Sequence, residues 1–236
     1  MKTKVILFDL DGTLLPMDQE IFVKAYFKGI AKRLAPHGYD PEKLIKSIWG
    51  GTEAMIANNG EKTNEAVFWD FFATVFGERS RADEPKFAEF YEENFDDVSS
   101  VCGHDERADR IVKKIKEKGM KVALATNPIF PQIATRKRMK WAGLDENDFE
   151  LYTTYENSNY CKPNLDYYRV ILNQLGVAAS ECVMVGNDVG DDMVTQKLGM
   201  KVFLLTDNLI NKNNEDISEI PQGGFDELEA FIDTLD

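Results

Sequence analysis

Residues 4–13 read KVILFDLDGT, an apolar run followed by Asp9, Asp11, Gly12 and Thr13. The apolar part is continuous rather than alternating, which is typical of a strand that is covered on both faces. In an extended chain, residues two apart point to the same side. We therefore expect both carboxylates to face one pocket at the carboxyl edge of a sheet, where open α/β sheets bind ligands. A simple turn is the alternative interpretation of D-x-D-G taken alone.

Three later segments are also short, continuous apolar runs and are predicted to be buried strands. They are residues 121–125, 182–185 and 201–205. Helical patterns lie between them: apolar residues recur from 108 to 115 before Gly119, and again from 167 to 175 before Gly176. Glycine is a common stop signal after a helix. Strands that alternate with helices predict a parallel sheet with right-handed crossovers.

The segment 16–101 interrupts this alternation. It contains no convincing strand, but it has amphipathic stretches at residues 21–34, 41–49, 65–76 and 85–95, several of which are rich in Phe, Tyr or Trp. Aromatic residues at helical spacing are more often core than ligand-binding. The sequence therefore predicts an α/β protein, with a parallel-sheet core of residues 1–15 and 102–236 and an inserted all-helical domain at 16–101.

Three further segments also suggest local structure. Trp49-Gly50-Gly51-Thr52 would place a tight turn beside an aromatic side chain at a helix end, and these residues are candidates for substrate specificity. A plain helix stop is the simpler interpretation. The acidic, Asn-rich stretch 207–219 is expected to be an exposed loop, and residues 225–235 a short terminal helix.

A second acidic cluster follows the predicted strand 182–185 in the same way as the first. Residues 186–192 read GNDVGDD, with Asp188, Asp191 and Asp192. A helix N-terminal cap would explain this cluster alone. Two such clusters at the ends of buried parallel strands instead favour an oxygen-ligand site for Mg²⁺, which binds a few carboxylates together with water and phosphate oxygens.

Phosphate donors are predicted at two further strand ends or loops. The strand 121–125 is followed by Thr126 and Asn127, which offer a hydroxyl, an amide and nearby backbone N–H groups. Lys162 precedes Pro163, where a helix is predicted to begin, so its ammonium would be held near a phosphate. Each feature alone is common at strand ends and helix starts. It is their order relative to the acidic clusters that indicates phosphate chemistry.

Together these motifs resemble those of the haloacid dehalogenase superfamily of phosphohydrolases. The resemblance covers residues 4 to about 206, apart from the insertion. Asp9 to Thr13 match the first motif, Thr126 the second, Lys162 the third, and residues 186–192 the acidic fourth. The resemblance implies a Rossmann-like core, and it implies that the insertion is a helical cap between the first and second motifs.

The resemblance also implies roles for individual residues. Asp9 would be the nucleophile that forms an aspartyl-phosphate, and Asp11 the acid and base, with Thr126, Asn127 and Lys162 binding phosphate. The implied Mg²⁺ ligands are Asp9, the Asp11 backbone carbonyl and an acidic residue of the fourth motif. Many members carry aspartate where this chain has Asn187. We favour Asp188 as the ligand and expect Asp192 to orient metal waters or Lys162, while Asp191 stays an alternative.

The function predicted from this resemblance is a Mg²⁺-dependent phosphatase that acts on a small phosphorylated metabolite. Dehalogenases of the superfamily lack the second aspartate of the first motif, so Asp11 favours phosphoryl transfer. A phosphomutase of the β-phosphoglucomutase type stays open, because it would keep the same core. A non-catalytic phosphate- or metal-binding module is the third alternative, but it would be free to lose Asp9, Asp11 and Lys162.

The composition limits which partners are plausible. The 236 residues include 28 Lys and Arg against 41 Asp and Glu, a formal net charge of 28 − 41 = −13. This charge disfavours binding to nucleic acid or to an anionic membrane surface. The apolar run before Asp9 is too short for a signal peptide or a membrane span, and three scattered cysteines form no disulfide framework. We therefore expect a soluble cytoplasmic protein. The sequence specifies neither its substrate nor its oligomeric state.

The longest basic cluster lies in the gap between the second and third motifs. It consists of Arg136, Lys137, Arg138 and Lys140. At helical spacing, such a cluster is typical of a solvated helix face. We therefore expect these four side chains to be exposed.

Overall fold

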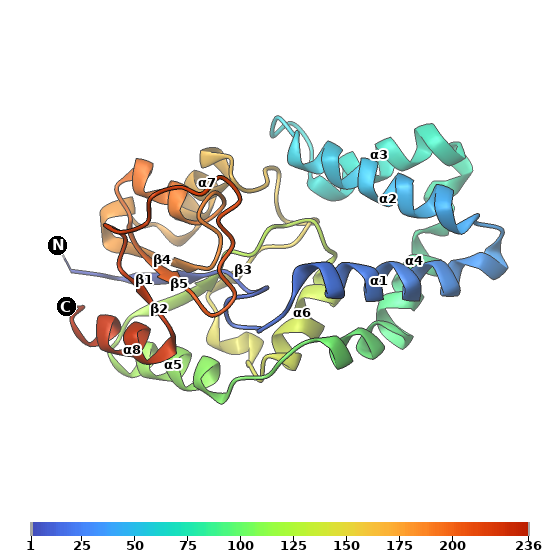
Figure 1. Ribbon diagram of the computed structural model, residues 1–236. Helices are drawn as coiled ribbons and strands as arrows, with labels where there is room; N and C mark the ends of the chain where they lie inside the picture. Colours follow the sequence, from blue (N-terminus) through green and yellow to red (C-terminus); the bar gives the residue numbers. More distant parts are fainter. Residues whose placement is uncertain (1, 236) are drawn as a thin grey trace.

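The computed structural model describes residues 2–235 and contains one parallel sheet of six strands (Figure 1). The strands lie in the order β3-β2-β1-β4-β5-β6. Their bounds are Val5–Phe8 (β1), Lys121–Leu124 (β2), Leu151–Tyr152 (β3), Cys182–Gly186 (β4), Lys201–Leu205 (β5) and Gln222–Gly223 (β6). The four predicted strands are confirmed, and they form the continuous centre of the sheet. The two-residue edge strands β3 and β6 were not predicted, because so short a segment has no distinct pattern.

Helices cover both faces of the sheet, as the continuous apolar strands predict. Helix α7 (Leu165–Leu175) packs on the face that carries Val5 and Leu7. Helices α5 (Glu106–Glu117) and α8 (Phe225–Asp233) pack on the opposite face, with Ile6 and Phe8 (Figure 1). Helix α6 (Gln132–Trp141) follows the loop after β2. Both predicted stop signals are confirmed, since Gly119 and Gly176 adopt positive φ angles of 77° and 67° just after α5 and α7.

A group of helices lies beside the sheet and is formed by the segment between β1 and α5 (Figure 1). Its α-helices are α1 (Gln19–Leu34), α2 (Pro41–Ile56), α3 (Asn64–Phe76) and α4 (Glu84–Glu93). The two ends of this segment meet, because Gly103 N donates to Pro16 O at 2.7 Å and Met17 pairs with Cys102 in an isolated bridge. The helical segment therefore leaves and re-enters the core at one place.

Gly50 and Gly51 lie inside α2, so the predicted helix end at these residues is wrong. A Cβ atom on Gly50 would lie 2.4 Å from the Phe71 ring, and one on Gly51 would lie 2.6 Å from the Phe68 ring. The two glycines thus allow α2 and α3 to approach closely. This contact compensates for the low helix propensity of glycine, which costs about 1 kcal/mol per residue.

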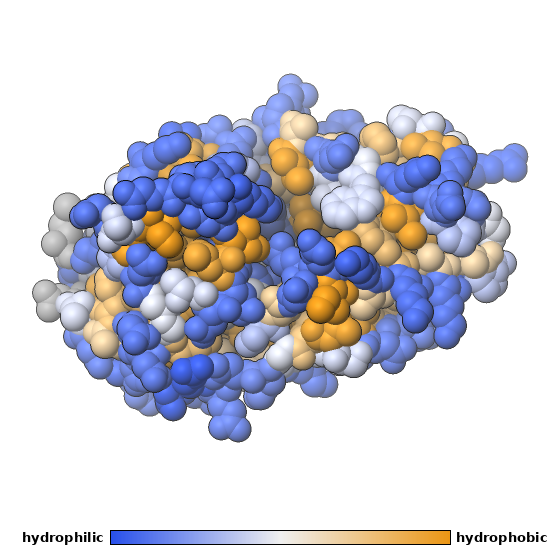
Figure 2. Space-filling view, in the orientation of Figure 1, coloured by the Kyte–Doolittle hydropathy of each residue, from blue (hydrophilic) through white to orange (hydrophobic). Residues whose placement is uncertain are grey.

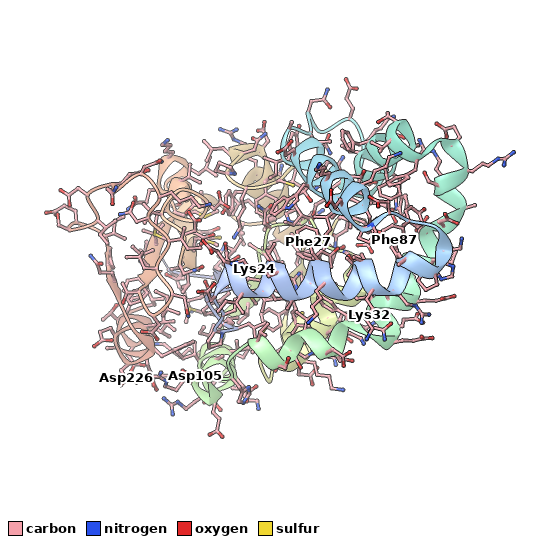
Figure 3. The ribbon with its side chains drawn as sticks, turned by 45° about the vertical axis from the view of Figure 1, so that its right-hand side comes forward. Lys24, Phe27, Lys32, Phe87, Asp105 and Asp226 are labelled. Carbon is pink, nitrogen blue, oxygen red and sulfur yellow. The ribbon has the colours of Figure 1, made fainter. Side chains whose placement is uncertain are left out.

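On the face shown in Figure 2, hydrophilic and hydrophobic residues are mixed, and a recess with hydrophobic side chains at its edge lies between the helical segment and the sheet core. Among residues 2–235, no helix is both long and apolar enough to cross a membrane. Phe27 of α1 and Phe87 of α4 lie on the side of α1 that faces α2 and α3 (Figure 3), where they line a shared cavity.

Candidate active site

The register of the three central strands places Asp9 between two other strand ends. Phe8 pairs with Leu124 of β2 and with Val185 of β4. The backbone continues the pairing for one residue, because Asp9 N donates to Val185 O at 2.9 Å and Ala125 N donates to Phe8 O at 2.7 Å. Asp9 therefore lies beside the start of the 186–192 loop and beside Thr126, at the carboxyl edge of the sheet.

Lys162 joins two of the predicted carboxylates in a buried ion-pair group. Its Nζ lies 2.8 Å from Asp9 Oδ1 and 2.6 Å from Asp192 Oδ1, and the lysine is 3% exposed. Burial lowers the pKa of Lys162, but the carboxylates of Asp192 and Asp9 outweigh burial and hold this pKa well above its usual value. The ammonium is therefore charged at neutral pH and is directed at Asp9.

Asp11 pairs with an arginine instead of with Lys162. Its Oδ2 accepts a hydrogen bond from Arg138 Nη1, and its Oδ1 is buried with no hydrogen-bond partner among residues 2–235. Burial raises the pKa of the Asp11 carboxyl, and the Arg138 guanidinium opposes this rise. A buried oxygen without a partner is costly, so Asp11 has one fixed oxygen and one that is available to a ligand.

Arg138 is fully buried, so the prediction that it belongs to a solvated helix face is wrong. Its guanidinium carbon lies 4.4 Å from the centre of the Phe130 ring. Its Nε donates to Ala134 O and its Nη2 to Thr135 Oγ1, both at 3.3 Å. The sequence gives little sign of this role, because the acidic partner is 127 residues away.

Thr13 and Asn187 hold the other side of the Asp9 carboxylate. Thr13 Oγ1 lies 3.2 Å from Asp9 Oδ2 and 3.0 Å from Asn187 Oδ1. Asn187 Nδ2 donates to Asn208 O at 2.7 Å, which ties the expected loop 207–219 to the site. Gly12 has a φ of 82°, and a Cβ atom there would lie 2.4 Å from Asn187 Nδ2. Glycine is therefore required both for the turn and for the approach of Asn187.

The aspartates of the acidic loop after β4 differ in burial and in hydrogen-bond partners. Asp192 is 1% exposed, and its Oδ2 accepts from Asp188 N at 3.1 Å while its Oδ1 contacts Lys162. Asp188 Oδ1 accepts from Gly190 N at 2.8 Å and from Asp191 N at 3.0 Å. A Cβ atom on Gly186 would lie 2.0 Å from Asp192 Oδ2, so this glycine admits the buried carboxylate. Both oxygens of Asp192 are thus engaged, one by Lys162 and the other by a backbone N–H.

The predicted phosphate donors lie on the next strand end. Asn127 Oδ1 accepts from Lys162 N at 3.3 Å, which joins the loop after β2 to the lysine. The Thr126 carbonyl accepts from Thr153 Oγ1 at 2.7 Å and from Tyr167 OH at 2.8 Å. These bonds fix the backbone around Thr126. The helix after Lys162 begins at Leu165 rather than at Pro163, because Asn164 caps it by accepting from Asp166 N.

The donor set at this sheet edge suits a hard divalent cation. Five carboxylates accompany two cations, a formal sum of 2 − 5 = −3 if all are ionised; the residues are Asp9, Asp11, Asp188, Asp191, Asp192, Arg138 and Lys162. Burial raises the pKa of Asp191; Lys162 acts against this rise, and the Asp188 and Asp9 carboxylates add to it. Carboxylates that repel one another at a partly buried sheet edge can be stabilised by a divalent cation.

Within residues 2–235, no group of three or more Asp, Glu, His or Cys side chains is arranged to coordinate a metal ion by itself. The predicted magnesium ligands contain only two carboxylates and one backbone carbonyl. Mg²⁺ usually keeps several waters and binds one or two carboxylates together with substrate phosphate. The residues present therefore fit the ion in an open site of this kind.

The helical segment is hydrogen-bonded directly to the two loops that carry Asn127 and Lys162. Asn64, at the start of α3, is fully buried, and its Nδ2 donates to Pro128 O at 3.1 Å and to Tyr160 O at 3.3 Å. Asn64 N also donates to Ser158 O at 2.8 Å. Asn64 therefore joins the helical segment to the two loops that carry the predicted phosphate donors Asn127 and Lys162.

An aromatic cavity of about 90 Å³ lies between the helical segment and the loop after Asn127. Trp49 is 46% exposed at this cavity, and its ring lies 5.3 Å from that of Phe27. The hydroxyls of Tyr26 and Tyr91 contact each other at 2.8 Å. The remaining lining residues are Val23, Ile48, Thr52, Phe68, Trp69, Phe87, Ile129, Phe130, Pro131 and Tyr155. Phe130 lines the cavity and also packs against the guanidinium of Arg138, the partner of Asp11. One aromatic side chain therefore connects the cavity to Arg138.

Comparison with known proteins agrees with the resemblance inferred from the motifs. The chain is 26% identical over 206 residues to the pyrophosphatase PpaX of Halalkalibacterium halodurans, covering 87% of this chain and 84% of that protein. It is 23% identical over 212 residues to the phosphoglycolate phosphatase of Aquifex aeolicus, covering 90% and 89%. The crystal structure of a HAD phosphatase from Thermococcus onnurineus has the same fold, with a TM-score of 0.61 at 20% identity over 98% of both chains.

The family model described as haloacid dehalogenase-like hydrolase matches residues 3–199, which include all four motifs and the helical segment. This match covers most of the chain, and it confirms the family that the order of the motifs predicted. The chain is a member of the haloacid dehalogenase-like hydrolase family.

Proposed function

We propose that the protein is a Mg²⁺-dependent phosphatase that hydrolyses a small organic phosphomonoester through a phosphorylated Asp9. The observation that carries this proposal is the pairing at the sheet edge. Asp9 lies 2.8 Å from the buried ammonium of Lys162, and Asp11 lies two residues further on with an available oxygen. The names of the related phosphatases support the reaction class.

In the first step, a carboxylate oxygen of Asp9 attacks phosphorus and the bond from phosphorus to the leaving oxygen breaks. Lys162 offsets the charge of the approaching phosphate, which otherwise repels the carboxylate. Asp11, in its protonated form, gives its proton to the leaving oxygen, so the product departs as a neutral alcohol. Proton transfer of this kind contributes roughly 10²–10⁴-fold to a rate.

In the second step, a water molecule attacks the phosphorus atom of the aspartyl-phosphate. Asp11, now a carboxylate, takes a proton from this water, and the bond from phosphorus to Asp9 breaks. Inorganic phosphate leaves, Asp9 is restored as a carboxylate, and Asp11 is again protonated. The same side chain therefore acts as acid and then as base, which balances the protons over one cycle.

Bound Mg²⁺ would neutralise phosphate charge and help to align the phosphoryl group. We propose Asp9, the Asp11 carbonyl and Asp188 as its protein ligands, with Asp191 as the alternative to Asp188. Asp192 is better placed to orient Lys162, because both of its oxygens are engaged by Lys162 and by the backbone.

Removal of divalent cations is expected to abolish phosphatase activity, and added Mg²⁺ should restore it. Asp188→Asn is expected to raise the Mg²⁺ concentration for half-maximal activity by at least about 10-fold, because loss of a ligand weakens metal binding. The measurement is a Mg²⁺ titration of EDTA-treated enzyme. Asp166→Asn, at an exposed carboxylate paired with Arg169, is the control that should leave the titration unchanged. If Asp191→Asn shifts the titration and Asp188→Asn does not, Asp191 is the ligand.

We propose that residues 16–101 form a cap over a core of residues 1–15 and 102–236. The support is the meeting of the two connections at Pro16 and Gly103, together with the contacts of Asn64 to loops of the core. A cap at this place excludes water from the phosphorylated intermediate and contacts the organic part of the substrate.

The aromatic cavity favours an organic phosphomonoester over pyrophosphate. An apolar leaving group gains free energy on entering a space lined by Trp, Tyr and Phe side chains. The leaving group of pyrophosphate is itself an anion, and its desolvation beside such side chains is unfavourable. Trp49 and Thr52, two of the residues predicted to set specificity, both line this cavity.

We therefore expect a higher kcat/KM for benzyl phosphate than for pyrophosphate, by about 10-fold or more, a difference of about 1.4 kcal/mol. Trp49→Ala is expected to raise KM for benzyl phosphate by about 10-fold and to leave pyrophosphate nearly unaffected. The measurement is steady-state kinetics of both substrates. Ile21→Ala, at an exposed apolar residue of α1 that does not line the cavity, is the matched control. Faster hydrolysis of pyrophosphate, unchanged by Trp49→Ala, would contradict this substrate class.

The two alternatives from the sequence are separable by product analysis. A phosphomutase would isomerise a sugar phosphate without net release of phosphate, whereas a phosphatase releases it. A non-catalytic module would do neither. The buried and mutually paired Asp9, Lys162 and Asp192 favour a working site, because buried charges are costly to retain without a function.

A further inference from the structure

We propose that Arg138 is a positioning residue for Asp11: it binds one carboxylate oxygen and thereby directs the other to the leaving group. This inference rests on the proposed phosphatase function. The first observation is the ion pair itself, in which Arg138 Nη1 donates to Asp11 Oδ2 from a side chain that is 1% exposed. Asp11 cannot rotate freely while this contact is kept.

The second observation is that Arg138 is itself held in place from several directions. The Phe130 ring lies against its guanidinium at 4.4 Å, Ala134 O accepts from Nε, and Thr135 Oγ1 accepts from Nη2. A planar guanidinium fixed in this way loses little further freedom when it binds a carboxylate. Arg138 is therefore a rigid support rather than a mobile surface charge.

The third observation is the asymmetry of the Asp11 carboxyl. Oδ2 is bound by Arg138, whereas Oδ1 is buried without a partner in the described part of the chain. Only Oδ1 is free to exchange a proton with a substrate oxygen. A group that transfers protons must be held close to the productive geometry, so fixing Oδ2 has a direct effect on the rate.

The buried ion pair of Arg138 and Asp11 also has a desolvation cost, which a purely structural role does not explain. Burying an arginine and a carboxylate is expensive, and replacing such a pair by packed apolar side chains is often neutral or stabilising. Arg138 lies on α6 of the core and bonds to a loop residue after β1. The pair is therefore best explained by what it does to Asp11.

The test compares two esters that differ by one methylene group. In 4-nitrobenzyl phosphate the leaving oxygen is an alkoxide that needs the proton from Asp11, whereas the 4-nitrophenolate of 4-nitrophenyl phosphate leaves readily without one. Arg138→Met is expected to lower kcat/KM for the benzyl ester by about 10²-fold or more, and for the phenyl ester by less than about 10-fold. Arg138→Lys should recover part of the loss, because it restores the charge but not the planar fork.

A double-mutant cycle then shows whether Arg138 affects the rate through Asp11. If Arg138 acts through Asp11, Arg138→Met causes no further loss of kcat/KM for the benzyl ester in an Asp11→Asn background. Arg136→Met, which removes an exposed arginine of the same helix paired with Glu146, is the control that should change neither ester. Thermal unfolding shows whether Arg138→Met folds; if it does not, the comparison of esters is made with Arg138→Lys.

The outcomes separate this inference from the proposed function. Equal losses for both esters, or the same loss in the Asp11→Asn background, would overturn the role of Arg138 and leave the phosphatase proposal intact. Hydrolysis of neither ester by the wild-type enzyme would instead contradict the proposed function itself.

Discussion

Asp9→Asn is expected to lower phosphatase activity by about 10⁴-fold or more while the protein stays folded. The amide is a poor nucleophile, and removal of a nucleophile typically costs about 10⁴–10⁶-fold. The substituted amide keeps the shape of the original side chain, and Lys162 would keep its contact of 2.6 Å with Asp192. The loss of free energy of unfolding should therefore be small, about 1–2 kcal/mol.

Two measurements check this expectation. Initial rates of phosphate release compare the variant with the wild type, and mass spectrometry of acid-quenched enzyme detects a phosphoryl group on the peptide that contains Asp9. The wild type should carry this group during turnover and the variant should not. Asp226→Asn serves as the control, because Asp226 (labelled in Figure 3) is an exposed carboxylate whose only ion-pair partner within residues 2–235 is Arg107. Undiminished turnover of Asp9→Asn would refute the nucleophile assignment.

The sequence was most informative where function depends on neighbouring residues. Asp9 and Asp11 are two residues apart on one extended segment, and the motifs after β2 and β4 each follow a strand that is recognisable from its continuous apolar residues. Because the strands are parallel and adjacent, their ends must meet at one edge. The contact of Lys162 with Asp9 does not follow from the strand order, because Lys162 lies in the loop between β3 and α7. The sequence placed this lysine only before a predicted helix and near a phosphate.

The features that sequence reasoning missed depend on contacts between distant segments. Arg138 reads as part of a basic surface cluster, and only its tertiary partner Asp11 gives it another role. Gly50 and Gly51 read as a helix stop, but close packing of α2 against α3 keeps them helical. In both cases a tertiary contact outweighs the local preference, and a single sequence does not contain the pairing.

Lys162→Met is expected to lower activity strongly and to destabilise the protein at the same time. The variant leaves Asp9 and Asp192 without their shared cation, in a site where the lysine is 3% exposed. Removing one partner of a buried ion pair costs about 3–5 kcal/mol, which corresponds to a decrease in Tm of roughly 10 °C for a chain of this size. Loss of the charge that stabilises the transferring phosphoryl group lowers kcat by about 10²–10³-fold or more.

The double variant Lys162→Met with Asp192→Asn separates these two effects. It removes one of the uncompensated carboxylates, so its Tm should recover by several degrees relative to Lys162→Met. Its kcat should stay as low as that of the single variant, because Asp9 still lacks a cation for the phosphate. Thermal unfolding and steady-state kinetics of the wild type and the single and double variants measure both quantities. If activity returned together with Tm, Lys162 would act only by keeping the site folded; if Tm alone returned, Lys162 would act on the phosphate.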